Sequence, residues 1–91
     1  RSQVLSMAME ADVKDHRKKL FLIVLADSIG SDGEGLVDPA DLARRCSMHP
    51  EIVKEMFDWL ERLDVLRWAR ETLGESRFFR VNLQHEIWGR K

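Results

Sequence analysis

The sequence predicts a mainly α-helical domain with a small antiparallel β-hairpin near its C-terminal end. Three observations support this fold class. A capping residue followed directly by proline, at Asp38-Pro39 and again at His49-Pro50, marks the starts of two consecutive helices. Apolar residues recur at helical spacing after the second proline. Aromatic and β-branched residues then lie on both sides of a glycine-containing loop, which is typical of a hairpin.

Length and composition indicate one globular domain. The chain has 91 residues, of which 44% are hydrophobic and 34% charged. We divide it into an N-terminal helix or arm (1–14), a core (15–82) and a C-terminal tail (83–91). The longest apolar run, Leu20 to Ala26, is too short to span a membrane. A single cysteine, Cys46, excludes an internal disulfide and suits a reducing compartment, so we expect a cytoplasmic protein.

The N-terminal third predicts two helices. Val4 to Met9 is apolar and compatible with a helix, and Ser2 is available as its cap. Asp15 is placed to cap a second, strongly apolar helix, which we expect Gly30 to end. The residues from 31 to 35 then predict a turn.

The central segment predicts a short strand and two helices. Leu36-Val37 is the candidate strand. The first helix follows the cap Asp38 and ends near Cys46, and the second follows the cap His49 and runs from Pro50 to Leu63. The expected apolar stripe of the second helix comprises Val53, Met56, Phe57, Leu60 and Leu63, with Ile52 and Trp59 at its edge.

The hairpin is predicted from two runs with strand character, 65–70 and 77–82, which contain Trp68, Phe78, Phe79 and Val81. The intervening residues 71–76 are the expected loop, with Gly74 at a positive φ.

The run LARRCSMHPEIVKEMFDWLERLDVLR resembles the helix-turn-helix of winged helix-turn-helix proteins, and the preceding KKLFLIVLADSIGSDGEG resembles their first helix and turn. Together the likeness covers residues 15–82. It is nearest to the domains of bacterial, phage and plasmid replication initiators and regulators. It implies three core helices, a small sheet, and a role in transcription regulation or DNA replication. It also implies that the helix from Pro50 is the recognition helix, which approaches the major groove.

Charge is distributed unevenly along the chain, although the formal net charge is only −1. Residues 1–19 carry five bases and three acids, and residues 20–41 carry five acids and no base. Residues 42–63 balance at four of each, and residues 64–91 carry six bases and four acids. Positive charge therefore gathers at the N-terminal segment and on the hairpin.

The candidate nucleic-acid-binding residues are the cations and the histidine of the recognition helix and the hairpin: His49, Lys54, Arg62, Arg67, Arg70, Arg77 and Arg80. A basic hairpin can grip phosphates or enter a minor groove. The alternative is that the arginine stems cover apolar surface and their guanidinium groups pair with Glu71, Glu75 or Glu86.

The helix from Pro50 has an acidic outer face, whose charged residues are Glu51, Lys54, Glu55, Asp58, Glu61 and Arg62. Such a face is repelled by phosphates. It is either solvated surface or a docking face for a basic partner protein. Trp59 and Trp88 are either partner anchors or core residues.

The expected partner is double-stranded DNA, and a homodimer or a protein partner remains open. A continuous positive surface from the hairpin to Lys18, Lys19, Arg44 or Arg45 would favour DNA. A hairpin neutralised by acids would favour a protein.

Catalytic and metal-binding patterns are weak. Cys46 and His49 form one C-x-x-H pair, whereas a zinc site needs four ligands, so Cys46 is expected to be a small buried residue at the helix-turn-helix corner. Gly33-x-Gly35 lacks the Lys-Ser/Thr of a phosphate loop. We therefore expect no enzyme activity, no cofactor, no membrane contact and no small-molecule substrate.

Overall fold

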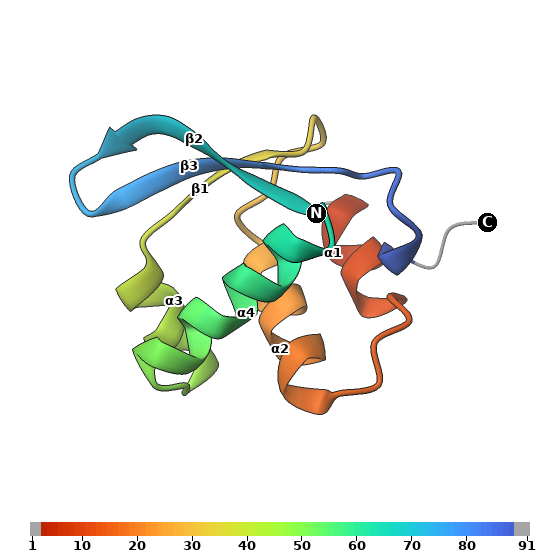
Figure 1. Cartoon of the computed structure of the whole chain (residues 1–91). Coiled ribbons are helices and arrows are strands. Elements are labelled where there is room, and N and C mark those ends of the chain that lie inside the picture. Colours follow the sequence, from red (N-terminus) through yellow and green to blue (C-terminus); the bar gives the residue numbers. More distant parts are fainter. Residues whose placement is uncertain (1–2, 89–91) are drawn as a thin grey trace.

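Four α-helices and a three-stranded antiparallel sheet make up the described part of the chain, residues 3–88, in a computed structural model (Figure 1). The helices are α1 (Gln3–Met9), α2 (His16–Ala26), α3 (Pro39–Cys46) and α4 (Pro50–Arg62). The strands are β1 (Glu34–Val37), β2 (Leu66–Leu73) and β3 (Ser76–Val81), and a 3-10 helix, η1, covers Glu86–Trp88. The helices lie on one side of the sheet, as Figure 1 shows.

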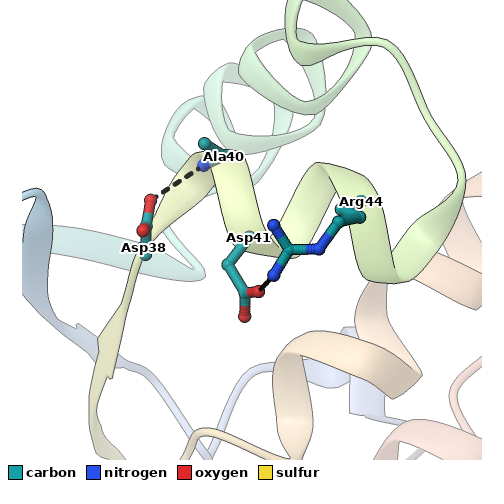
Figure 2. Close-up of polar contacts among 4 residues, drawn as sticks. All are labelled: Asp38, Ala40, Asp41 and Arg44. Atoms are coloured by element: carbon teal, nitrogen blue, oxygen red, sulfur yellow. Dashed lines mark hydrogen bonds and ion pairs between the residues drawn. The ribbon is translucent and has the colours of Figure 1, made fainter.

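Side-chain caps fix the starts of three helices. The Asp15 carboxylate accepts the backbone N–H two residues on at 2.9 Å, and Asp38 does the same at 3.0 Å (Figure 2). The Nδ1 atom of His49 accepts the corresponding N–H at 3.1 Å. These caps satisfy N–H groups that have no partner within the helix, as the sequence predicted. The predicted cap of α1, Ser2, lies outside the described residues.

The end of α2 differs from the prediction. The helix ends at Ala26, four residues before Gly30. Ile29 instead forms an isolated antiparallel bridge with Gly35 and is buried. The chain leaves the helix early because Ile29 gains both a backbone pairing and a place in the core.

The turn between α3 and α4 is tight. Ser47 caps α3 in the left-handed region, at φ 55° and ψ 42°. The backbone N–H of Met48 donates to the carbonyl of Ala43 at 2.9 Å. Cys46 is buried at this corner, as expected.

The last turn of α4 is shorter than predicted. The helix ends at Arg62, with Leu63 as its C-cap and Asp64 in the left-handed region at φ 66°. Leu63 is 41% exposed, so its assignment to the apolar stripe was wrong. Because the helix stops one residue earlier, Leu63 leaves the buried face. The other four stripe residues are buried.

The hairpin is longer than predicted. The strands continue to Leu73 and Ser76 and are joined by Gly74-Glu75 alone, with Gly74 at φ 60°. The expected loop of residues 71–76 was therefore too long, because a two-residue turn with glycine at its first position lets the flanking residues pair. A register shift between Trp68 and Thr72 marks a β-bulge in β2.

The sheet has the order β1-β3-β2, with β3 in the centre. Phe79 and Val81 of β3 are buried beneath the helices, together with Leu66, which pairs with Val81. Neighbouring residues in a strand point to opposite faces. Arg80 and Phe78 therefore lie on the outer face, away from the helices.

An aromatic chain connects α2, α4 and the sheet through the core. The Phe57 ring lies 5.0 Å from that of Phe21 and 4.7 Å from that of Trp68, and Trp68 lies 6.0 Å from Phe79. Trp88 closes one end of the core, where it is buried and its Nε1–H donates to the Asn82 carbonyl at 2.9 Å.

Candidate nucleic-acid interface

The seven candidate residues lie on α4 and on the two hairpin strands. His49, Lys54 and Arg62 come from α4 and its cap, Arg67 and Arg70 from β2, and Arg77 and Arg80 from β3. Figure 1 shows the hairpin tip on the same side of the molecule as α3 and the start of α4. The fold therefore brings the hairpin and the start of α4 to one side.

His49 is exposed at the start of α4 and its ring is fixed by the helix cap. Because Nδ1 accepts the N–H of Glu51, the other ring nitrogen is the one left for an external partner. The capping role ties its position to the helix terminus.

The outer face of α4 is acidic in the structure. Lys54 and Arg62 are exposed, and so are the four acids Glu51, Glu55, Asp58 and Glu61. The Glu61 carboxylate accepts a hydrogen bond from Trp68 Nε1 at 3.2 Å. No ion pair on the described chain neutralises the other three acids.

Two hairpin arginines lie opposite each other on the outer face of the sheet. Arg67 pairs in register with Arg80, so two like charges meet across the strands. Arg67 forms an ion pair with Asp64 at 3.2 Å, and Arg80 forms one with Glu34 of β1. These two arginines do pair with acids, as the alternative interpretation held, but the acids are not Glu71, Glu75 or Glu86, because the register places Glu34 directly opposite Arg80.

The other two hairpin arginines are arranged differently. The Arg77 guanidinium lies over the Trp68 ring, 4.0 Å from its centroid, on the side of the sheet that faces α4. Arg70 is exposed and lies within the bulge between Trp68 and Thr72. Neither arginine forms an ion pair with a described residue.

The bases that would extend a positive surface beyond the hairpin all have partners. Arg44 forms an ion pair with Asp41 (Figure 2), and Arg45 forms one with Asp27 at 3.1 Å. On α2, the Lys18 ammonium lies 4.7 Å from the centroid of a Trp59 ring, and Lys19 donates to the Ala11 carbonyl at 2.6 Å.

The charges of the hairpin therefore match neither expectation completely, neither the fully positive surface that favours DNA nor the neutralised hairpin that favours a protein. The outer hairpin pair, Arg67 and Arg80, is neutralised by acids, whereas Arg70 and Arg77 are not. Of the bases beyond the hairpin, Arg44 and Arg45 of α3 are paired with acids, whereas Lys18 and Lys19 of α2 form no ion pair with a described residue.

The tryptophans do not form an exposed anchor. Trp88 is buried, which excludes it from docking a partner in this conformation. Trp59 is half-buried against the core beneath Lys18, and Trp68 is half-buried beneath Arg77. These positions fit the core interpretation of Trp59 and leave no support for docking through exposed tryptophans.

Within the described residues, no group of three or more His, Cys, Asp and Glu side chains is arranged to hold a metal ion. Burial raises the pKa of the Cys46 thiol, an effect that the nearby Arg45 charge only partly offsets. The Nδ1 atom of His85 accepts the backbone N–H of Ile87 at 3.0 Å. Among the described residues, no helix has both the length and the apolar character needed to cross a membrane.

A groove of about 650 Å³ lies on the outer face of the sheet and was not predicted. Its floor includes Leu36, Ala69 and Phe78, and its rim includes Arg67 and Arg80. The alternation of side chains along a strand predicts that Phe78 lies on this face. Its partner, Leu36, could not be predicted, because it lies 42 residues earlier in the chain (78 − 36).

No family model, curated protein or solved structure matches this chain. The four helices and three-stranded sheet of the described chain are compatible with a winged helix.

Proposed function

We propose that this chain is a winged-helix module that binds double-stranded DNA mainly through its hairpin, which serves as the wing. The role is one of binding in a transcriptional regulator or replication initiator. The observation that carries the proposal is the pair of unneutralised arginines, Arg70 and Arg77, on the wing. The wing tip lies on the same side as the start of α4 (Figure 1).

The geometry of Arg77 supports a role in phosphate contact. Its guanidinium lies over the Trp68 ring. The Trp68 indole packs against Phe57, and its Nε1–H donates a hydrogen bond to the Glu61 carboxylate. A guanidinium held in this way loses less conformational freedom when it binds, while its N–H edges stay available to a phosphate.

The ion pairs of Arg67 and Arg80 reduce the contribution of these two residues but do not exclude it. Both side chains are largely exposed, and surface ion pairs of this kind contribute at most about 1 kcal/mol. Phosphates can therefore compete for them. The acidic face of α4 opposes close approach, so the wing is the stronger contact and α4 contributes through His49, Lys54 and Arg62.

The second candidate is a protein-docking module, and the unpaired acids on α4 favour it. Glu51, Glu55 and Asp58 lie at helical spacings of four and three, so they share one exposed stripe. Such a stripe complements a basic segment of a partner protein. The two candidates predict opposite effects of neutralising it.

The test is fluorescence anisotropy with a random-sequence duplex at several salt concentrations. Each lost phosphate contact reduces the slope of log affinity against log salt by about 0.9. We expect Arg70→Ala with Arg77→Ala to weaken binding to all sequences and reduce the slope by up to about 2. The matched control is Lys14→Ala with Arg17→Ala, which removes the same charge from two exposed residues, one before the cap of α2 and one in its first turn.

The double variant Glu55→Gln with Asp58→Asn distinguishes the candidates. It should tighten binding to the duplex, because it removes repulsion, and it should weaken binding to a lysine- and arginine-rich probe peptide if α4 docks a protein. If the parent shows no salt-dependent DNA binding even at low ionic strength, the DNA proposal fails. Equal losses in the wing variant and its control would exclude the wing as the contact.

A further inference from the structure

The outer face of the sheet is open, although it carries apolar side chains. All the helices of the described chain lie on the other side of the sheet (Figure 1). Leu36 and Phe78 are paired across β1 and β3 on this face, and Phe78 is 37% exposed. Together with Ala69 of β2 they form the floor of the groove of about 650 Å³.

The rim of the groove carries both signs of charge in equal number. Arg67 and Arg80 are its bases, and Glu34 and Glu71 are its acids. Glu71 is exposed and forms no ion pair with a described residue. A rim with no net charge is poorly suited to a nucleic acid or to a partner of one charge sign, but it suits a surface that is itself balanced.

The same face carries a protruding apolar side chain next to the groove. Leu73 is 62% exposed and pairs with Ser76 at the end of the hairpin. Arg77 and its partner Thr72 lie on the helix-facing side, so alternation places Leu73, Ser76 and Phe78 on the outer side. Ser76 precedes Phe78 by two residues, about 7 Å along the strand. The protruding side chain of Leu73 and the groove therefore lie side by side on one surface.

We propose that two copies of this chain associate through the outer faces of their sheets, with Leu73 of each copy seated in the groove of the other. A twofold axis between Leu73 and the groove lets each copy insert its Leu73 into the groove of the other, as an isologous interface requires. It also brings the bases of each rim to the acids of the other. The inference does not depend on DNA binding, because Arg77 lies on the helix-facing side of the hairpin, which stays free; of the hairpin arginines, only Arg67 and Arg80 lie on the face that the dimer would cover.

The first test is sedimentation equilibrium of the protein without DNA, from about 10 µM to 1 mM. A contact confined to one face of a three-stranded sheet is expected to give a weak, concentration-dependent dimer. Leu73→Glu removes two buried leucines per dimer and should raise the dissociation constant at least ~100-fold. The control is Met9→Glu, which alters a residue of α1 that is 60% exposed and should leave the dimer unchanged.

The second test exchanges the rim charges. Glu71→Arg gives a more basic rim and Arg67→Glu a more acidic one, so each variant alone should dimerise more weakly than the parent. Mixing the two should restore dimers, because unlike rims then meet. The proposal is overturned if the parent stays monomeric at 1 mM, if Leu73→Glu dimerises like the parent, if Met9→Glu weakens the dimer as strongly, or if the mixture of charge variants gives no heterodimer.

Discussion

Replacing Phe57 with alanine should remove much of the stability of the domain. The side chain is 4% exposed and lies between the rings of Phe21 and Trp68, with an interplanar angle of 85° to the first and 52° to the second. The substitution therefore deletes the middle ring of the chain that joins α2, α4 and the sheet. A buried Phe→Ala change costs about 3–5 kcal/mol.

That cost is large relative to the total. A domain of this length has a free energy of unfolding of roughly 5–14 kcal/mol, at about 0.05–0.15 kcal/mol per residue. Each 1 kcal/mol lowers the melting temperature by about 4–8 °C in a domain of this size. We therefore expect Phe57→Ala to lower the melting temperature by about 12–40 °C.

The assay is thermal and urea unfolding followed by circular dichroism at low micromolar concentration. Phe78→Ala is the matched control, because it removes the same ring from the outer face of the sheet and should cost less than about 1.5 kcal/mol. If Phe57→Ala melts within a few degrees of the parent, or no lower than Phe78→Ala, the placement of Phe57 at the centre of the core is wrong.

Three further predictions concern single sites. Gly35→Ala should lower stability by about 1–3 kcal/mol in urea unfolding, because the new Cβ would lie 2.6 Å from the Phe79 ring. The backbone N–H groups of Lys18 and Arg17 hold the pKa of Asp15 below its ordinary value of 3.8. The carboxylate therefore stabilises the fold fully above that pH, and this stabilisation is lost as the pH falls toward the lowered pKa. In Asp15→Asn, the urea concentration at the unfolding midpoint should depend less on pH in this acid range. Cys46 should react with Ellman's reagent at least about tenfold more slowly in the folded protein than in urea, because burial suppresses its thiolate.

Features that depend on a few neighbouring residues could be predicted from the sequence. The caps Asp15, Asp38 and His49 each bond an N–H two residues away, so the residue type and the following helix suffice to identify them. The same holds for Gly74, whose positive φ is set by a tight turn. At these positions the conformation that the local sequence favours is the one that the folded protein adopts.

Features that depend on distant partners could not be predicted. The early end of α2 follows from the bridge between Ile29 and Gly35, and the extension of the hairpin follows from cross-strand pairing. The clearest case in the candidate site is Arg80, whose acid, Glu34, lies 46 residues away in the chain. Counting charges along the hairpin identified its four arginines but not their partners, and the partners decide which arginines remain available.

The bulge in β2 controls which hairpin residues share a face. Between the pairs Trp68–Phe79 and Thr72–Arg77, β2 advances four residues while β3 advances two, so β2 holds two extra residues. An even number preserves the alternation of faces, whereas a single extra residue would reverse it beyond the bulge. With one extra residue, Leu73 would turn toward the helices and Thr72 toward the groove. The bulge thus keeps Arg77 over Trp68 while Leu73 stays on the outer face, and so it separates Arg77, a principal proposed DNA contact, from the face proposed to meet a second copy.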